Sequence, residues 1–114
     1  MQAVRFVAVG ELLVDVLATG SGHEASIGVV PGGSAFNAAI AAAALGAETT
    51  VIGTVGGDPG GRMILAELAG HGVDAEISVS AGSTGTFLLA GGEIRVDRGA
   101  SREIALADRW QHCR

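Results

Sequence analysis

Residues 31–56 read PGGSAFNAAIAAAALGAETTVIGTVG, which predicts a glycine turn, then an alanine-rich helix, then a buried strand. Gly32 and Gly33 leave backbone amides uncovered at the turn. Asn37 follows one turn into the helix, so its side chain is expected beside the free amides of the helix N-terminus. These hydrogen-bonding groups converge where a small polyhydroxylated ligand could be held.

The order of the predicted elements indicates α/β architecture. Residues 5–9 form a short apolar, β-branched run, typical of a strand buried on both faces, and we expect it at the centre of a parallel sheet. Residues 49–55 give a second strand after the helix, and this strand–helix–strand order favours a right-handed βαβ crossover. Asp58, followed by proline, is then expected to cap another helix that runs to about residue 70.

Short strand-like runs on either side of this core predict two hairpins. The first is expected over about residues 12–30, with Pro31 ending its second strand. The second is expected over about residues 84–98, with Gly91 and Gly92 as its turn. Both hairpins are expected to project from the α/β layer.

Composition and charge exclude several classes of function. With 114 residues, of which 48% are hydrophobic, the chain is one domain or part of one. A net charge of −5 with dispersed arginines argues against nucleic acid as a partner. No apolar run reaches the roughly 20 residues of a membrane span, so no membrane partner is expected. Cys113 is the only cysteine, which excludes an internal disulfide and favours the cytoplasm, and no His/Cys cluster has metal-ligand spacing.

A longer ordered set of residues carries a family resemblance. Glycines, alanines and one asparagine stand at set distances: Gly32, Gly33, Ala35, Asn37, Ala39, Gly46 and Gly56. In this set the chain resembles the first signature of the PfkB (ribokinase-like) family of carbohydrate kinases. Residues 9–15 resemble that family's opening strand and its sugar-contacting acid, and residues 55–61 resemble its Val-Gly-x-Asp-x-x-Gly segment. The similarity covers about Val4 to Ala100, which makes it far more specific than a lone glycine motif.

The resemblance implies a fold and a set of binding residues. It implies that residues 1–114 are the N-terminal part of one ribokinase-like domain, with a parallel sheet, βαβ crossovers and the two hairpins as a small β lid over a sugar. The sugar-binding residues that it implies are Asp15, Gly32, Gly33, Asn37 and Arg98. Arg98 belongs to an Asp-Arg-Gly-Ala stretch, where it could face an anionic or hydroxylated substrate.

Each of these residues also has a plain structural reading. Asp15 could lie on an exposed face of a strand, although an unpaired carboxylate in an apolar run would cost several kcal/mol if it were buried. Asn37 could face water, although an amide that both donates and accepts can bridge two hydroxyls. The glycine pair could serve turn geometry alone, and Arg98 could be a surface arginine.

The resemblance also implies a reaction, and this chain lacks the segment that carries the family's catalytic aspartate. Family kinases transfer the γ-phosphoryl of ATP to a sugar hydroxyl, with an aspartate as base, and the full-length enzyme is expected to use ATP and Mg²⁺. The family carries that aspartate in a downstream Gly-Ala-Gly-Asp segment, which does not occur here. We therefore expect no catalytic, cofactor-binding or metal-binding residue in these 114 residues, and no activity from the isolated chain.

Two functions remain open from the sequence. The chain could be the N-terminal portion of an ATP-dependent sugar kinase, truncated in its gene or by proteolysis, or a short non-catalytic sugar-binding or dimerisation module. Lid edges of this kind invite pairing with a second copy, so a homodimer through the lid is a further expectation. A nicotinamide-binding domain is disfavoured because no Gly-x-Gly-x-x-Gly follows the first strand. Ribose, fructose, a keto-deoxy sugar acid and a nucleoside all remain open as substrates.

Overall fold

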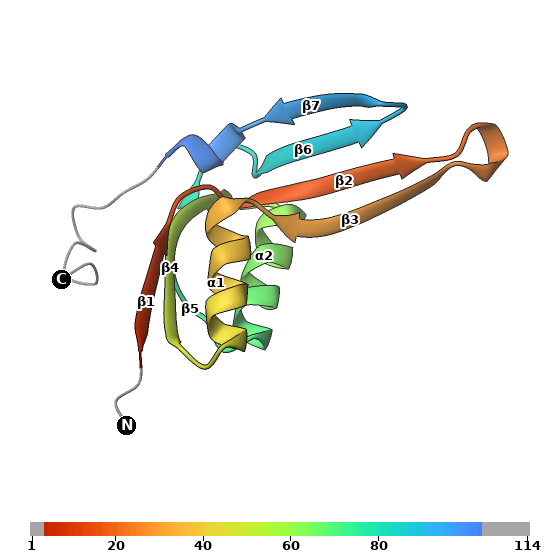
Figure 1. Cartoon of the computed structure of the whole chain (residues 1–114). Coiled ribbons are helices and arrows are strands. Elements are labelled where there is room, and N and C mark those ends of the chain that lie inside the picture. Colours follow the sequence, from red (N-terminus) through yellow and green to blue (C-terminus); the bar gives the residue numbers. More distant parts are fainter. Residues whose placement is uncertain (1–3, 104–114) are drawn as a thin grey trace.

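The computed structural model describes residues 4–103, which form an α/β layer and a second sheet that projects from it (Figure 1). Cys113 lies outside the described residues. The α/β layer holds a three-stranded parallel sheet in the order β1-β4-β5. Its strands are β1 (Arg5–Val9), β4 (Glu48–Gly56) and β5 (Asp74–Ser80). Helices α1 (Ser34–Ala44) and α2 (Pro59–Gly70) cover one face of this sheet (Figure 1).

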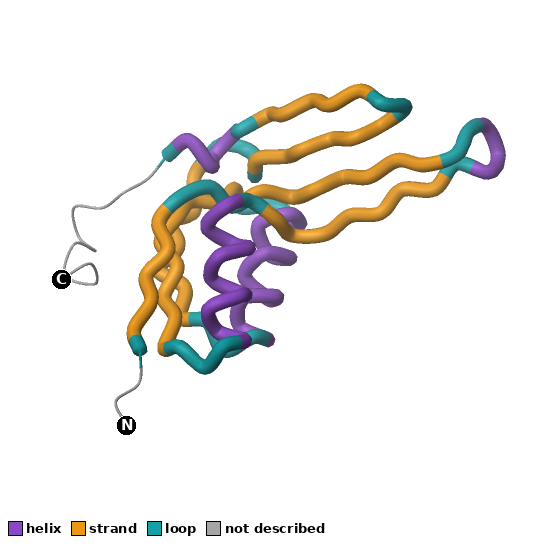
Figure 2. Tube along the Cα trace, viewed as in Figure 1, coloured by secondary structure: helices purple, strands orange, loops and turns teal. Residues whose placement is uncertain are grey.

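The projecting sheet has four strands in the order β3-β2-β6-β7 and extends beyond the ends of the helices (Figure 2). Its strands are β2 (Leu13–Thr19), β3 (Ser26–Gly32), β6 (Gly85–Ala90) and β7 (Glu93–Asp97). Two antiparallel hairpins, β2 with β3 and β6 with β7, join side by side because β2 runs parallel to β6. Two short 3-10 turns, η1 (Gly22–Glu24) and η2 (Gly99–Arg102), complete the described elements.

Local sequence explains where the elements begin and end. Helix α1 begins after Gly33, whose φ of 99° few other residues adopt, and the chain leaves the helix through Gly46 at φ 91°. Helix α2 begins at Pro59 after an aspartate cap. The turn between β6 and β7 is Gly91-Gly92, with φ of 55° and 79°, as a two-residue turn with positive φ at both positions requires.

One apolar cluster joins the helices to the sheet. Leu12, Val51, Ile64 and Leu68 are fully buried in it, and each such side chain contributes about 1.5–3 kcal/mol by leaving water. Val14, on β2, belongs to the same cluster, so the base of the projecting sheet packs directly on the core.

The predicted fold class is confirmed, and two finer expectations were wrong. Strand β1 lies at the edge of the described sheet and β4 at its centre. An apolar run indicates that a strand is buried against a neighbouring layer, but it does not distinguish an edge strand from a central one. Pro31 does not end a strand but lies within β3, opposite Val14. Proline is tolerated there because β3 is an edge strand, where no ladder bond depends on its missing N–H.

Candidate functional site

The predicted binding residues lie where the projecting sheet meets the first turn of α1. Gly33 connects β3 to α1, and the loop after β1 passes directly against it. A side chain at position 33 would place its Cβ 3.0 Å from the carbonyl carbon of Glu11 and 3.1 Å from the amide nitrogen of Leu13. Ala35 N–H donates to the Glu11 carbonyl at 3.3 Å. The glycine therefore allows three segments to converge at the start of the helix.

Asp15 and Gly32 are brought together by the pairing of β2 with β3. Leu13 stands opposite Gly32 in the register, so Asp15 is two residues further along the same face of β2. A Cβ at position 32 would lie 2.7 Å from Asp15 Cγ and 2.8 Å from Asp15 Oδ1. The half-buried Asp15 carboxylate therefore occupies the space that the missing side chain leaves free. This contact gives Gly32 a role besides turn geometry.

Asn37 lies one turn into α1 and its side chain is exposed. Its backbone N–H donates to the Gly33 carbonyl at 2.9 Å, which closes the first turn of the helix. Within the described residues, no hydrogen bond joins its side-chain amide to Asp15. The structure therefore leaves Asn37 at the rim, near the glycine pair and open to solvent.

Arg98 forms an ion pair with Glu11, which was not among the predicted binding residues. Its Nε lies 3.3 Å from Glu11 Oε1, with the arginine side chain 64% exposed and the glutamate side chain 31% exposed. An exposed ion pair of this kind is worth up to about 1 kcal/mol, so a ligand could redirect Arg98 at small cost. In the sequence, the only indication of Glu11 was its place in the Gly10-Glu11 dipeptide directly after β1, within the stretch that carries the family resemblance.

Asp58 caps α2 as predicted, and it also bonds to a residue far along the chain. Gly61 N–H donates to Asp58 Oδ1 at 2.9 Å, which is the expected cap. Thr84 N–H donates to Asp58 Oδ2 at 2.8 Å, and the Thr84 hydroxyl donates to Oδ1 at 2.5 Å. The hydroxyl bond from Thr84, then its amide bond and the bond from Gly61, lower the pKa of Asp58 below its ordinary value.

This lowered pKa predicts an acid-dependent contribution to stability. Because the pKa is lower in the folded chain than in the unfolded one, Asp58 stabilises the fold above about pH 4 and loses this contribution as pH falls further. The free energy of unfolding of the native chain should exceed that of Asp58→Asn by a constant amount at neutral pH. This difference should shrink below about pH 4. Urea unfolding followed by circular dichroism at several pH values measures it.

Asp74→Asn controls for the loss of one negative charge, because Asp74 is exposed at the start of β5. The free energy of unfolding of Asp74→Asn should differ little from that of the native chain. This small difference should not show the change below about pH 4 that is expected for Asp58→Asn. A gap between the native chain and Asp58→Asn that stays constant down to pH 2 would contradict the assigned network.

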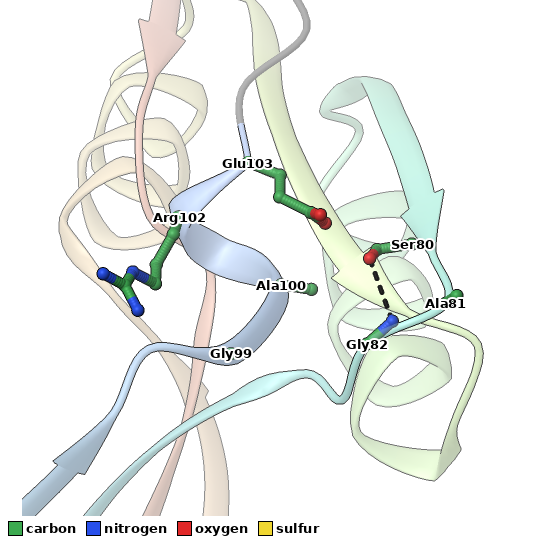
Figure 3. Close-up of a pocket in the computed structure, with 7 residues that line it drawn as sticks. All are labelled: Ser80, Ala81, Gly82, Gly99, Ala100, Arg102 and Glu103. Carbon is green, nitrogen blue, oxygen red and sulfur yellow. Dashed lines mark hydrogen bonds between the residues drawn. The ribbon is translucent and has the colours of Figure 1, made fainter.

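An open hollow of about 470 Å³ lies elsewhere, between η2 and the end of β5 (Figure 3). Its lining residues are Ser80, Ala81, Gly82, Gly99, Ala100, Arg102 and Glu103. Ser80 Oγ accepts from Gly82 N–H at 3.0 Å and so shapes the loop at one side (Figure 3). None of the five predicted sugar-binding residues lines this hollow.

Metal-binding clusters and membrane-spanning helices are both lacking in the described part of the chain. Between residues 4 and 103, no three His, Cys, Asp or Glu side chains lie close enough to hold a metal ion. Over the same residues, neither helix has the length and apolar character needed to cross a bilayer.

Comparison with known proteins gives consistent matches over most of the chain. A family model described as pfkB family carbohydrate kinase matches residues 4–111. A ribokinase from Bacillus subtilis is 38% identical over 88 residues, which are 72% of this chain and 30% of that protein. The matched residues span less than a third of the length of each of the three curated relatives found by sequence.

Solved structures agree with the sequence matches. An uncharacterized sugar kinase from Pyrococcus horikoshii in complex with ATP aligns with a TM-score of 0.78 and 27% identity, covering 95% of this chain and 39% of that one. A fructokinase from Vibrio cholerae, in its fructose-, ADP- and calcium-bound form, aligns with a TM-score of 0.76 and 26% identity, covering 92% of this chain and 36% of that one. The predicted ribokinase-like fold is thereby confirmed.

Proposed function

Because this chain belongs to the pfkB family of carbohydrate kinases, we propose that it forms the sugar-binding part of an enzyme that phosphorylates a sugar hydroxyl. The observation that carries the proposal is the Asp15 carboxylate held over Gly32, beside the first turn of α1. A carboxylate accepts hydrogen bonds only, and sugar hydroxyls donate them. In this proposal Asp15 binds a hydroxyl pair of the sugar.

The other four predicted residues complete the proposed sugar site. Gly32 and Gly33 supply backbone groups and room for the close approach of the ligand. Asn37 stands at the rim, where its amide can donate to one hydroxyl and accept from another. Arg98 exchanges its contact with Glu11 for a hydroxyl or a carboxylate of the substrate.

We propose that the four-stranded projecting sheet serves as the lid of this site. The support is positional, because Asp15 is on β2, Gly32 is on β3, and Arg98 directly follows β7. Strand β6 links the two hairpins by pairing with β2, so the whole sheet is one unit. A movement of this sheet would therefore carry Asp15 with it.

We propose that the full-length enzyme binds ATP and Mg²⁺ through residues outside this chain, and that the isolated chain transfers no phosphoryl group. The support for this division is that the 114 residues contain no Gly-Ala-Gly-Asp segment. The single cysteine of the chain supports a cytoplasmic location.

Calorimetric titration of the chain with ribose, fructose, a keto-deoxy sugar acid and a nucleoside tests the proposed function. Saturable binding of one of them, with no product in a coupled kinase assay with ATP and Mg²⁺, is the expected result. A folded chain that binds none of the four at millimolar concentration would refute the proposal.

The mass of the native polypeptide separates the two functions that the sequence left open. A native protein longer than this chain, with a Gly-Ala-Gly-Asp segment, supports the kinase. A native protein of 114 residues that binds sugar supports the short non-catalytic module.

A further inference from the structure

The carboxylate of Asp58 makes more hydrogen bonds than a helix cap needs. The cap uses one oxygen, through the bond from Gly61 N–H. Two further bonds come from Thr84, which lies 26 residues along the chain and is buried. The Thr84 hydroxyl in turn accepts from Gly56 N–H at 2.9 Å. Two side chains thus join the end of β4, the start of α2 and the residue that precedes β6.

Glycines at positions 56 and 61 allow the cluster to pack closely against the backbone. A Cβ at Gly56 would lie 2.6 Å from Thr84 N and 2.9 Å from Asp58 Oδ2. A Cβ at Gly61 would lie 3.2 Å from the Thr84 hydroxyl and would collide with the Gly56 carbonyl. Real Cβ atoms do not approach this closely, so the close packing depends on glycine at both positions.

The cluster lies at the base of the projecting sheet. Strand β6 begins at Gly85, directly after Thr84, and a Cβ at Gly85 would collide with Leu13 and with the Arg98 carbonyl. In the sheet, Phe87 of β6 stands opposite Asp15 of β2. The pairing therefore couples the position of β6 to that of the strand that carries Asp15.

We propose that Asp58 and Thr84 form a pivot that fixes the projecting sheet relative to the α/β layer, and that both are positioning residues for the sugar that Asp15 binds. The second part of this proposal, that the two residues position the sugar, rests on the proposed function. Neither side chain contacts the sugar in this arrangement. They act through the start of β6, which holds β2 and Asp15 in register.

Thr84→Val tests the pivot because it removes the hydroxyl, keeps the shape of the side chain and leaves the Gly61 cap in place. Thr84→Ser is the matched control, since it restores a hydroxyl. Amide hydrogen exchange of the chain without ligand is compared between β6–β7 and α1. For Thr84→Val we expect exchange in β6 and β7 to rise about tenfold or more, because Gly56 N–H and Asp58 lose a partner. Exchange in α1 should change less than about twofold, and Thr84→Ser should resemble the native chain.

Uniformly faster exchange in α1 and in β6–β7, or no change in either, would overturn the pivot. If Thr84→Val does not fold, Asp58→Ser gives the same comparison, because serine can cap α2 but is too short to hold Thr84. Titration with the sugar that the native chain binds is the second readout, and its dissociation constant should rise about tenfold or more in Thr84→Val. Altered exchange without sugar binding by the native chain would refute the proposed function alone. Sugar binding with unaltered exchange would refute the pivot alone.

Discussion

Replacing Asp15 by Asn is expected to weaken monosaccharide binding by about 10- to 100-fold, because hydrogen bonds to a charged acceptor are worth about 1.5–3 kcal/mol. The amide has the size of the carboxylate, so its contact with Gly32 remains possible. Calorimetric titration measures the dissociation constant, and thermal unfolding of the same samples reports the fold. We expect the unfolding midpoint to change little, since Asp15 is half-buried at the base of the sheet.

The matched control is Asp74→Asn, which makes the same chemical change on an exposed residue of β5. It should leave sugar affinity within about twofold of the native chain. If Asp15→Asn and Asp74→Asn bind the sugar with equal affinity, Asp15 is not part of the site. If Asp15→Asn binds the sugar more weakly and its thermal unfolding curve also lacks a folded baseline, Asp15 has a structural role instead.

The parts of the fold that could be predicted from the sequence are those that local physics decides. The alanine-rich run could be predicted as a helix that ends near Gly46, because alanine favours helix and only glycine readily adopts the positive φ that follows. The Gly91-Gly92 turn followed from the positive φ that a two-residue hairpin requires. The two strands on either side of α1 then left a βαβ crossover as the favoured connection.

The parts that could not be predicted depend on contacts between distant segments. Asp58 is a good cap in any context, so nothing local indicates that its second oxygen bonds to Thr84. Glu11 and Arg98 meet only because β2 pairs with β6 and aligns the ends of the two hairpins. Position in the sheet is equally non-local, so the sequence could not show that β1 lies at the edge of the three parallel strands formed within residues 4–103. In the site, the glycine turn could be predicted from the local sequence. The contact between Asp15 and Gly32 could not, because it depends on the register in which β2 pairs with β3.

One face of the projecting sheet carries exposed apolar side chains, and we propose that a second copy of the chain covers it. The register places on this face Leu17 opposite Leu89, and Leu89 opposite Ile94. Leu17 and Leu89 are 40% and 37% exposed, and Ile94 is 61% exposed. Neighbouring exposed apolar residues of this kind mark an interaction surface, and a two-fold axis lets the same patch serve both partners.

The double substitution Leu89→Lys with Ile94→Lys is therefore expected to convert a dimer into a monomer. Two unpaired ammonium groups in an apolar interface cost several kcal/mol per subunit, so the dimer dissociation constant should rise at least about 100-fold. Sedimentation equilibrium over a series of concentrations should show twice the 11.3 kDa chain mass for the native protein and the single mass for the variant. Ile27→Lys is the control, because Ile27 is 68% exposed but pairs with Ala18 on the opposite face of the sheet. A native chain that sediments as a monomer, or a control that dissociates as readily as the double variant, would rule out this face as the dimer interface.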